Sequence, residues 1–181
     1  MRAADPSPVS SPAYARSTPP SPRVSYALTH PEVYVPLGCL PIKITTFFRW
    51  DPATGHPRHY HWAIFIPTSP VPGIGHYYEL AGDSQPYHIQ STIDNYNARR
   101  GLERGSHTVG YVSPVMLPYL EAHFALVPVE NLRRFWNSQN WVCDALQGLN
   151  HPLIFAVRAT LEDLVTQMAI VSAAWEAGNV K

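Results

Sequence analysis

The stretch Trp136-Asn137-Ser138-Gln139-Asn140-Trp141-Val142-Cys143-Asp144-Ala145-Leu146 has the pattern of an amphipathic helix with a hydroxyl in its first turn. At about 100° per residue, several apolar positions fall within about 80° of Ser138 on a helical wheel. They are Trp141, Val142, Ala145, Leu146 and Leu149. Ser138 is therefore expected in the middle of the face that the helix buries.

Two interpretations of this helix start are open. Asn137 or Ser138 caps the helix, which is the commoner use of such residues. Alternatively, Ser138 is a nucleophile at a position where backbone N–H groups and the helix dipole favour negative charge.

The composition predicts a globular protein with no electrostatic signature for nucleic acid. The 181 residues are 45% hydrophobic and 12% aromatic, which suits a domain with a substantial core. Charged residues make up only 14% and the formal net charge is zero, so neither nucleic acid nor an anionic membrane surface is expected as a partner. The low charge predicts an apolar surface, which suits a protein partner or self-association.

Cysteine usage and hydropathy indicate an intracellular protein. Cys39 and Cys143 make neither a disulfide framework nor a zinc quartet. No secretory signal and no apolar run of about 20 residues is recognised. We therefore expect a cytoplasmic or nuclear protein that is not secreted and has no transmembrane segment.

The chain divides into two compositional zones. Residues 1–30 are rich in Pro, Ser, Thr and Ala, and are predicted to form a disordered tail. Residues 31–181 are predicted to form a single domain, whose folded part begins near Val33.

The rest of the pattern predicts strands first and helices later. Strands are expected over 41–50, 60–66, 76–81, 87–93 and 107–112, from their β-branched and aromatic content and the turn residues between them. Helices are expected over 114–126, 137–149 and 160–177, the last with Thr160 as N-cap and Asp163 completing a near capping box. This order predicts an α+β domain built on an antiparallel sheet. The loops 67–75 and 83–106, with Tyr87, Tyr96, Arg99, Arg100 and Arg104, are expected to frame a binding groove.

Three polar residues stand out on the predicted strands. His59, His61, Ala63 and Phe65 share one face by alternation, and Trp62, Ile64 and Ile66 share the other. The ordinary interpretations are a solvated His59 and a core His61. Glu79 sits in an aromatic strand, where it either faces water or is buried with a partner.

A metal site is not expected from these histidines. Zinc needs a third and a fourth ligand. The other histidines show no recognisable ligand spacing: His56, His76, His88 and His107.

Together, His61, Glu79 and Ser138 fit the general logic of a catalytic triad. A nucleophile at a helix start, a histidine base and a third residue that orients the histidine are its three parts.

Three motifs resemble the circularly permuted papain-like (NlpC-type) superfamily, near its lecithin:retinol acyltransferase-like branch and related fungal proteins of uncertain function. They are His61-Trp62-Ala63-Ile64-Phe65-Ile66, Tyr78-Glu79-Leu80-Ala81 and Asn137-Ser138-Gln139-Asn140-Trp141-Val142. The resemblance covers roughly residues 42–149. It implies a papain-like antiparallel sheet packed against the helix that carries the nucleophile position.

The resemblance also implies residue roles. His61 matches the family's catalytic base, and Glu79 stands where the acyltransferase branch has a second histidine. Ser138 stands where the family has its nucleophilic cysteine, so this chain is expected to be inactive or nearly so. Cys143 lies about 140° around the wheel from Ser138 and is expected to be a packing residue. Trp62, Gln139 and Trp141 are expected to contact the substrate.

Three interpretations of function therefore stay open. The chain is a papain-like thiol hydrolase or acyltransferase scaffold for amide, thioester or ester bonds, with a nucleophile lost naturally or by an introduced substitution. Otherwise it is a non-catalytic binding module that uses the same groove, or a true serine hydrolase. No cofactor is expected, and the ligand can be a small molecule, a lipid or a peptide.

Overall fold

The computed structural model describes residues 37–49, 54, 60–71, 73–82, 86–95, 103–156 and 159–178. The predicted tail 1–30 lies outside the described residues and stays a prediction. So do the expectations for His56, His59, Tyr96, Arg99 and Arg100, which lie outside them as well.

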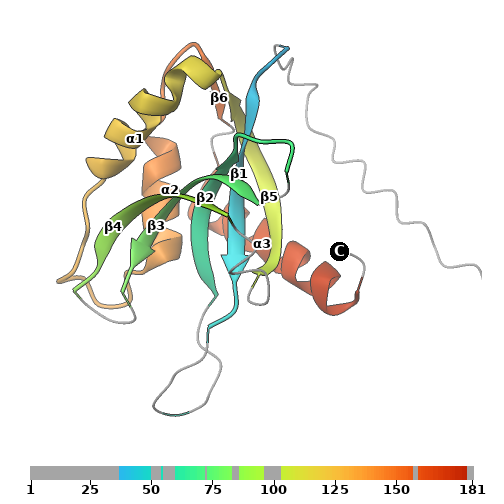
Figure 1. Cartoon of the computed structure of the whole chain (residues 1–181). Helices are drawn as coiled ribbons and strands as arrows, with labels where there is room; N and C mark the ends of the chain where they lie inside the picture. The colour runs from blue at the N-terminus through green and yellow to red at the C-terminus, as the bar shows by residue number, and fades with distance from the viewer. Residues whose placement is uncertain are drawn as a thin grey trace, which may run out of the picture. The chain divides into compact units, whose positions relative to one another are not determined.

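Six strands form one curled antiparallel sheet in the order β4-β3-β2-β1-β5-β6 (Figure 1). The strands are β1 Leu40–Phe47, β2 His61–Pro67, β3 Ile74–Ala81, β4 His88–Asn95, β5 Glu103–Val112 and β6 Ile154–Ala156. Every strand pair is antiparallel, and β2 lies between β1 and β3. The predicted α+β class with an antiparallel sheet is confirmed.

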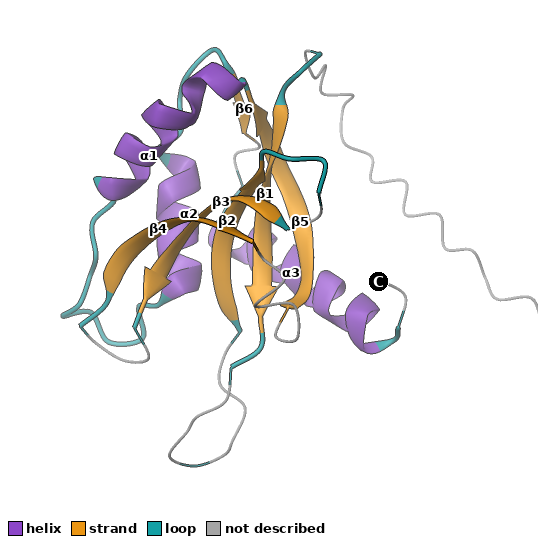
Figure 2. Ribbon diagram, viewed as in Figure 1, coloured by secondary structure: helices purple, strands orange, loops and turns teal. Residues whose placement is uncertain are grey.

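Three α-helices pack against this sheet (Figure 2). They are α1 Leu117–Ala125, preceded by the short 3-10 helix η2 Pro114–Met116, then α2 Ser138–Gln147 and α3 Leu161–Glu176. The predicted capping box at α3 is confirmed, because the Thr160 side chain accepts from Asp163 N and the Asp163 side chain accepts from Thr160 N. The capping residues Thr160 and Asp163 therefore determine where α3 begins.

The sheet extends further than the pattern predicts. β5 begins at Glu103 instead of residue 107, and β3 begins at Ile74 instead of residue 76. The strand predicted over 87–93 is present as β4, which continues to Asn95. The polar segment Glu103–Ser106 has weak strand propensity and joins the sheet because it pairs with the end of β1. The three-residue β6 was missed, since so short a run beside Pro152 carries almost no periodic signal.

Both faces of the sheet are buried around β2. Trp62, Ile64 and Ile66 belong to the main core, together with apolar residues of all three helices. Ala63 and Phe65 belong to a second cluster on the opposite face. The predicted alternation is confirmed, but β2 has no water-facing side.

The start of α2 is held in place by large aromatic side chains. Trp136 precedes the helix and Trp141 lies in its first turns, and both are buried in the main core. On α1, His123 Nε2–H donates to Ala145 O at 3.0 Å, which links the two helices near the end of α2. These contacts fix the position of the residues at the α2 N-terminus relative to β2.

Candidate active site

Asn137, not Ser138, caps α2. The Asn137 side chain accepts from Gln139 N at 2.8 Å, and Asn140 Oδ1 accepts from Asn137 N at 3.1 Å, which completes a capping box. Ser138 is therefore the first residue of the helix, and its hydroxyl is not used for capping. The capping interpretation is therefore correct for Asn137, and the Ser138 hydroxyl is available for another contact.

The hydroxyl of Ser138 contacts the backbone of β2. Ser138 is only 7% exposed, and its Oγ accepts from Trp62 N at 3.2 Å. Pairing of β2 with β1 continues to His61, whereas pairing with β3 ends at Ala63 and Glu79. A helix side chain thus satisfies a strand amide at the point where the sheet pairing ends.

His61 and Glu79 form a buried hydrogen-bonded pair. Nε2 of His61 lies 2.9 Å from Oε2 of Glu79, and the two residues are 4% and 6% exposed. Because Glu79 pairs with Ala63, it lies diagonally across from His61 on the same face of the sheet. An ionised carboxylate can only accept, so this contact assigns the N–H to Nε2. Of the two interpretations of Glu79, the buried one with a partner is correct.

The α2 N-terminus touches β2 on both sides of His61. Ser138 Oγ bonds Trp62 N, and Gln139 Nε2–H donates to Tyr60 O at 3.3 Å. Since Trp62 N is bonded to the His61 carbonyl carbon, Ser138 Oγ lies within about 6 Å of His61 Cα. Within the described part of the chain, no hydrogen bond joins Ser138 to the His61 ring.

The two ring nitrogens of His61 lie in different surroundings. Nε2 contacts the Glu79 carboxyl group, and Nδ1 is buried. The structure thus joins His61 to Glu79 and places the Ser138 hydroxyl against the backbone next to His61.

The residues expected to contact substrate occupy different environments. The side chains of Trp62 and Trp141 are buried in the main core, where they pack α2 onto the sheet. Gln139 is partly exposed, so it is the one of these three residues whose side chain a substrate could contact.

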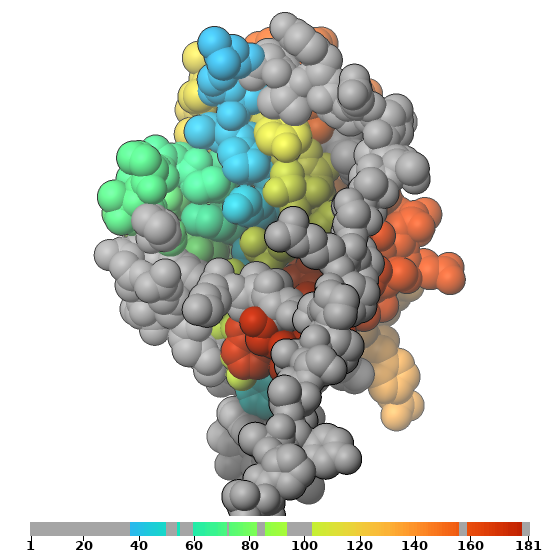
Figure 3. Space-filling model, turned by 90° about the vertical axis from the view of Figure 1, so that its right-hand side faces the viewer, coloured from blue at the N-terminus to red at the C-terminus, as the bar shows by residue number. Residues whose placement is uncertain are grey.

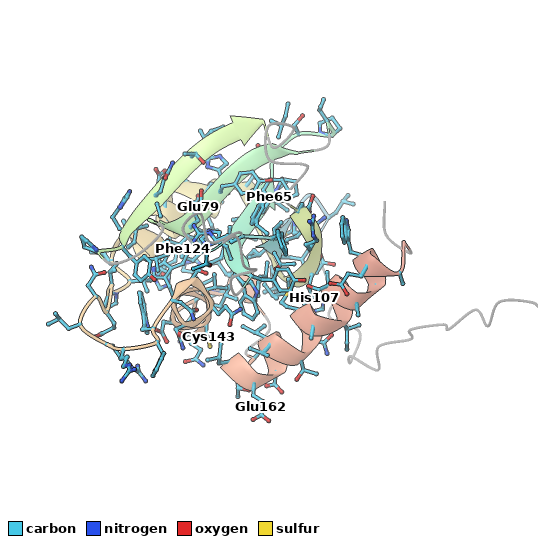
Figure 4. All side chains as sticks on the ribbon, turned by 90° about the horizontal axis from the view of Figure 1, so that it is seen from below. Phe65, Glu79, His107, Phe124, Cys143 and Glu162 are labelled. Atoms are coloured by element: carbon cyan, nitrogen blue, oxygen red, sulfur yellow. The ribbon has the colours of Figure 1, made fainter. Side chains whose placement is uncertain are left out.

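Cys143 lies apart from the site. Seen from below (Figure 4), it is on the side of α2 turned away from Glu79. It is 4% exposed, and burial, followed by the nearby Asp144 charge, raises the pKa of its thiol. The structure therefore agrees with a packing role.

Other expected binding residues have structural partners. The Arg104 guanidinium lies 3.9 Å from the Trp175 ring centroid and 5.0 Å from that of Phe48. The backbone of Tyr87 bonds the side chain of Asn131. Among the residues that the structure describes, no group of three His, Cys, Asp or Glu side chains could hold a metal ion.

Sequence reasoning missed the backbone groups of the site. Trp62 N–H and Tyr60 O bind α2, and backbone atoms have no residue-type signature. The Asn-x-x-Asn spacing of Asn137 and Asn140 was the one available signal, because it permits a capping box.

A Ser138→Ala substitution is expected to destabilise the fold by about 1–2 kcal/mol, because Trp62 N–H loses its acceptor in a buried place. Urea denaturation measures the loss. Ser172→Ala on α3, at similar burial, is the control and should cost less. Equal losses at the two positions would contradict a structural role for the Ser138 contact.

Comparisons with protein-family models, with curated proteins and with solved structures found no match for the chain. Within the described residues, no helix is long and apolar enough to cross a membrane.

Proposed function

We propose that this domain has the scaffold of a papain-like thiol hydrolase or acyltransferase for amide, thioester or ester bonds, in which Ser138 occupies the nucleophile position. The observation that carries the proposal is the buried His61–Glu79 hydrogen bond next to the N-terminus of α2. The resemblance of the three sequence motifs to the permuted papain-like superfamily supports it independently.

The proposed chemistry uses each group in a stated way. With a cysteine at position 138, the thiolate attacks the carbonyl carbon, and the leaving group departs with a proton from His61. Water or another acceptor then attacks the thioester and gives its proton to His61, the acyl carbon–sulfur bond breaks, and the thiolate at position 138 is released. Glu79 holds the imidazole in one tautomer through Nε2. The first amides of α2 are the donors expected close to the developing oxyanion.

Serine at this position changes the outcome. A helix N-terminus and a neighbouring histidine lower a thiol pKa enough to give substantial thiolate near neutrality. A serine hydroxyl ionises many pH units higher, so it requires concerted removal of its proton by His61. In this structure the hydroxyl oxygen instead accepts a hydrogen bond from a strand amide. The proposal is therefore that the chain as written turns over slowly or not at all.

The second candidate is a recognition module that keeps the fold without the chemistry. The structural use of the Ser138 hydroxyl as partner of Trp62 N–H favours it, since the serine then has a role that needs no reaction. A true serine hydrolase is the weakest candidate, because Ser138 and His61 share no hydrogen bond in the described structure.

The test is covalent acylation of a restored thiol. The Ser138→Cys chain, with Cys39→Ser to remove the other partly exposed thiol, is treated with p-nitrophenyl acetate. We expect release of p-nitrophenolate and gain of one acetyl group at residue 138, located by mass spectrometry of peptides.

The matched controls are the unsubstituted chain and the Ser138→Cys chain that also carries His61→Ala. Neither should acquire the acetyl group at an appreciable rate. Acylation of the unsubstituted chain at Ser138 would favour a serine hydrolase. Absence of acylation in folded Ser138→Cys protein would refute the enzyme scaffold and leave the recognition module.

A further inference from the structure

Four consecutive exposed residues lie in the loop that leads to α2. Leu132, Arg133, Arg134 and Phe135 form what we call the tip loop. The relative exposure of Leu132 is 102% and that of Phe135 is 80%, so two large apolar side chains meet solvent almost completely. In the space-filling view, the light-orange atoms of this part of the chain stand out from the body (Figure 3).

The tip loop is held at both ends by defined contacts. Before it, Asn131 Oδ1 accepts from Tyr87 N at 2.6 Å, and Asn131 Nδ2–H donates to Tyr87 O at 3.1 Å. After it, Trp136 is buried in the main core, and its backbone N–H donates to the backbone oxygen of Arg133 at 3.3 Å. The exposed side chains are thus presented from a fixed frame beside the start of β4.

Phe135 adopts a backbone conformation that bulky residues avoid. Its φ is +68°, and it is the one non-glycine residue with positive φ in the described structure. Gly or Asn would occupy this conformation with less strain. Strain of this kind, at a bulky side chain that packs against almost nothing, points to a use for the side chain outside the fold.

Charge and shape together indicate the surface that the tip loop would meet. Arg133 and Arg134 lie between the two apolar residues, and the Arg134 guanidinium is 4.7 Å from the Phe135 ring centroid. Glu130 is the one carboxylate in segment 130–135, which holds two arginines. Protruding apolar side chains with adjacent cations suit insertion into the headgroup region of an anionic bilayer.

We propose that the tip loop docks this domain onto an anionic lipid surface, with Leu132 and Phe135 entering the interface and the two arginines facing lipid phosphates. This inference does not depend on the chemistry proposed for Ser138. It departs from the expectation drawn from the zero net charge of the chain, because the attraction is local to the arginines of the tip loop. It would bring the α2 N-terminus close to the membrane, since Phe135 is only three positions before Ser138.

The test is sedimentation of the full chain with sucrose-loaded vesicles, either pure phosphatidylcholine or phosphatidylcholine containing about one-third phosphatidylglycerol. We expect measurable binding to the anionic vesicles and weaker binding to the neutral ones. The Phe135→Asn variant should lower the partition coefficient about tenfold. It should also raise Tm by a few degrees, because Asn tolerates the positive φ. Loss of binding then cannot be ascribed to unfolding.

Two further variants separate the apolar part from the charged part. Arg133→Gln combined with Arg134→Gln should remove most of the preference for anionic vesicles. Val115→Asn, at a similarly exposed apolar position on η2 (74%), should bind like the unsubstituted chain. The proposal is overturned if the unsubstituted chain does not sediment with anionic vesicles. It is also overturned if Phe135→Asn leaves binding unchanged, as it would where another part of the chain or a protein pocket were the true contact.

Discussion

The Ser138→Cys chain is expected to react with iodoacetamide at about pH 6.5 at least tenfold faster than the same chain carrying His61→Ala. The thiolate is the reactive form, so the rate at this pH reports how far the thiol pKa lies below about 8.5, its ordinary value. Three features of the site favour the anion: the N-terminus of α2, the N–H of Trp62 and the neighbouring His61 ring.

The measurement is the alkylation rate as a function of pH, followed by mass spectrometry. A lowered pKa keeps the thiolate populated as the pH falls, so the midpoint of the profile should move to lower pH in Ser138→Cys. Removal of the histidine should return it toward the ordinary value. Cys143 provides an internal standard, because burial raises its thiol pKa and it should react slowly throughout.

Two outcomes of the alkylation experiment would contradict the prediction. A profile with an ordinary midpoint, or one indifferent to His61→Ala, would mean that the histidine does not support a thiolate at position 138. The scaffold would then be suited to recognition and not to thiol chemistry.

The second large effect concerns the buried pair that supports the site. Glu79→Leu is expected to lower the free energy of unfolding by about 3 kcal/mol, because it removes the acceptor of the His61 Nε2–H in a place shielded from water. Glu79→Gln keeps an acceptor oxygen at the same reach and should cost about 1 kcal/mol. Urea denaturation at one fixed pH gives both values.

Glu121→Leu is the control for this comparison. Glu121 is exposed on α1, so its replacement should change the unfolding free energy by no more than about 0.5 kcal/mol. If Glu79→Leu and Glu79→Gln had the same free energy of unfolding, the hydrogen bond to His61 would contribute little to the stability of the fold.

The same substitutions link stability to the candidate chemistry. In the Ser138→Cys background, Glu79→Gln should keep much of the dependence of alkylation on His61, since the amide oxygen can still accept from Nε2–H. Glu79→Leu should lose that dependence, because nothing then holds the imidazole in the tautomer with Nδ1 unprotonated.

What the sequence determined by itself is local. The period of apolar residues predicts α2 with Ser138 on its buried face, the alternation along β2 predicts its two faces, and Thr160 with Asp163 predicts the start of α3. These features depend on residues only a few positions apart, so they can be predicted from the sequence without the fold.

What only the tertiary structure decided depends on groups far apart in the chain. The alternation along its strand allows Glu79 either to face water or to be buried. It is buried only because both faces of the sheet are covered at β2. The hydroxyl of Ser138 meets Trp62 N–H across 76 positions, through a backbone donor that no residue type reveals. The helix pattern placed Ser138 on the buried face, whereas the packing of α2 on β2 set its hydroxyl against Trp62 N–H, and the register of β2 with β3 set His61 beside Glu79. The physical reason is that hydrogen bonds of buried groups are completed by whatever the fold brings close, and burial itself is a property of the whole domain.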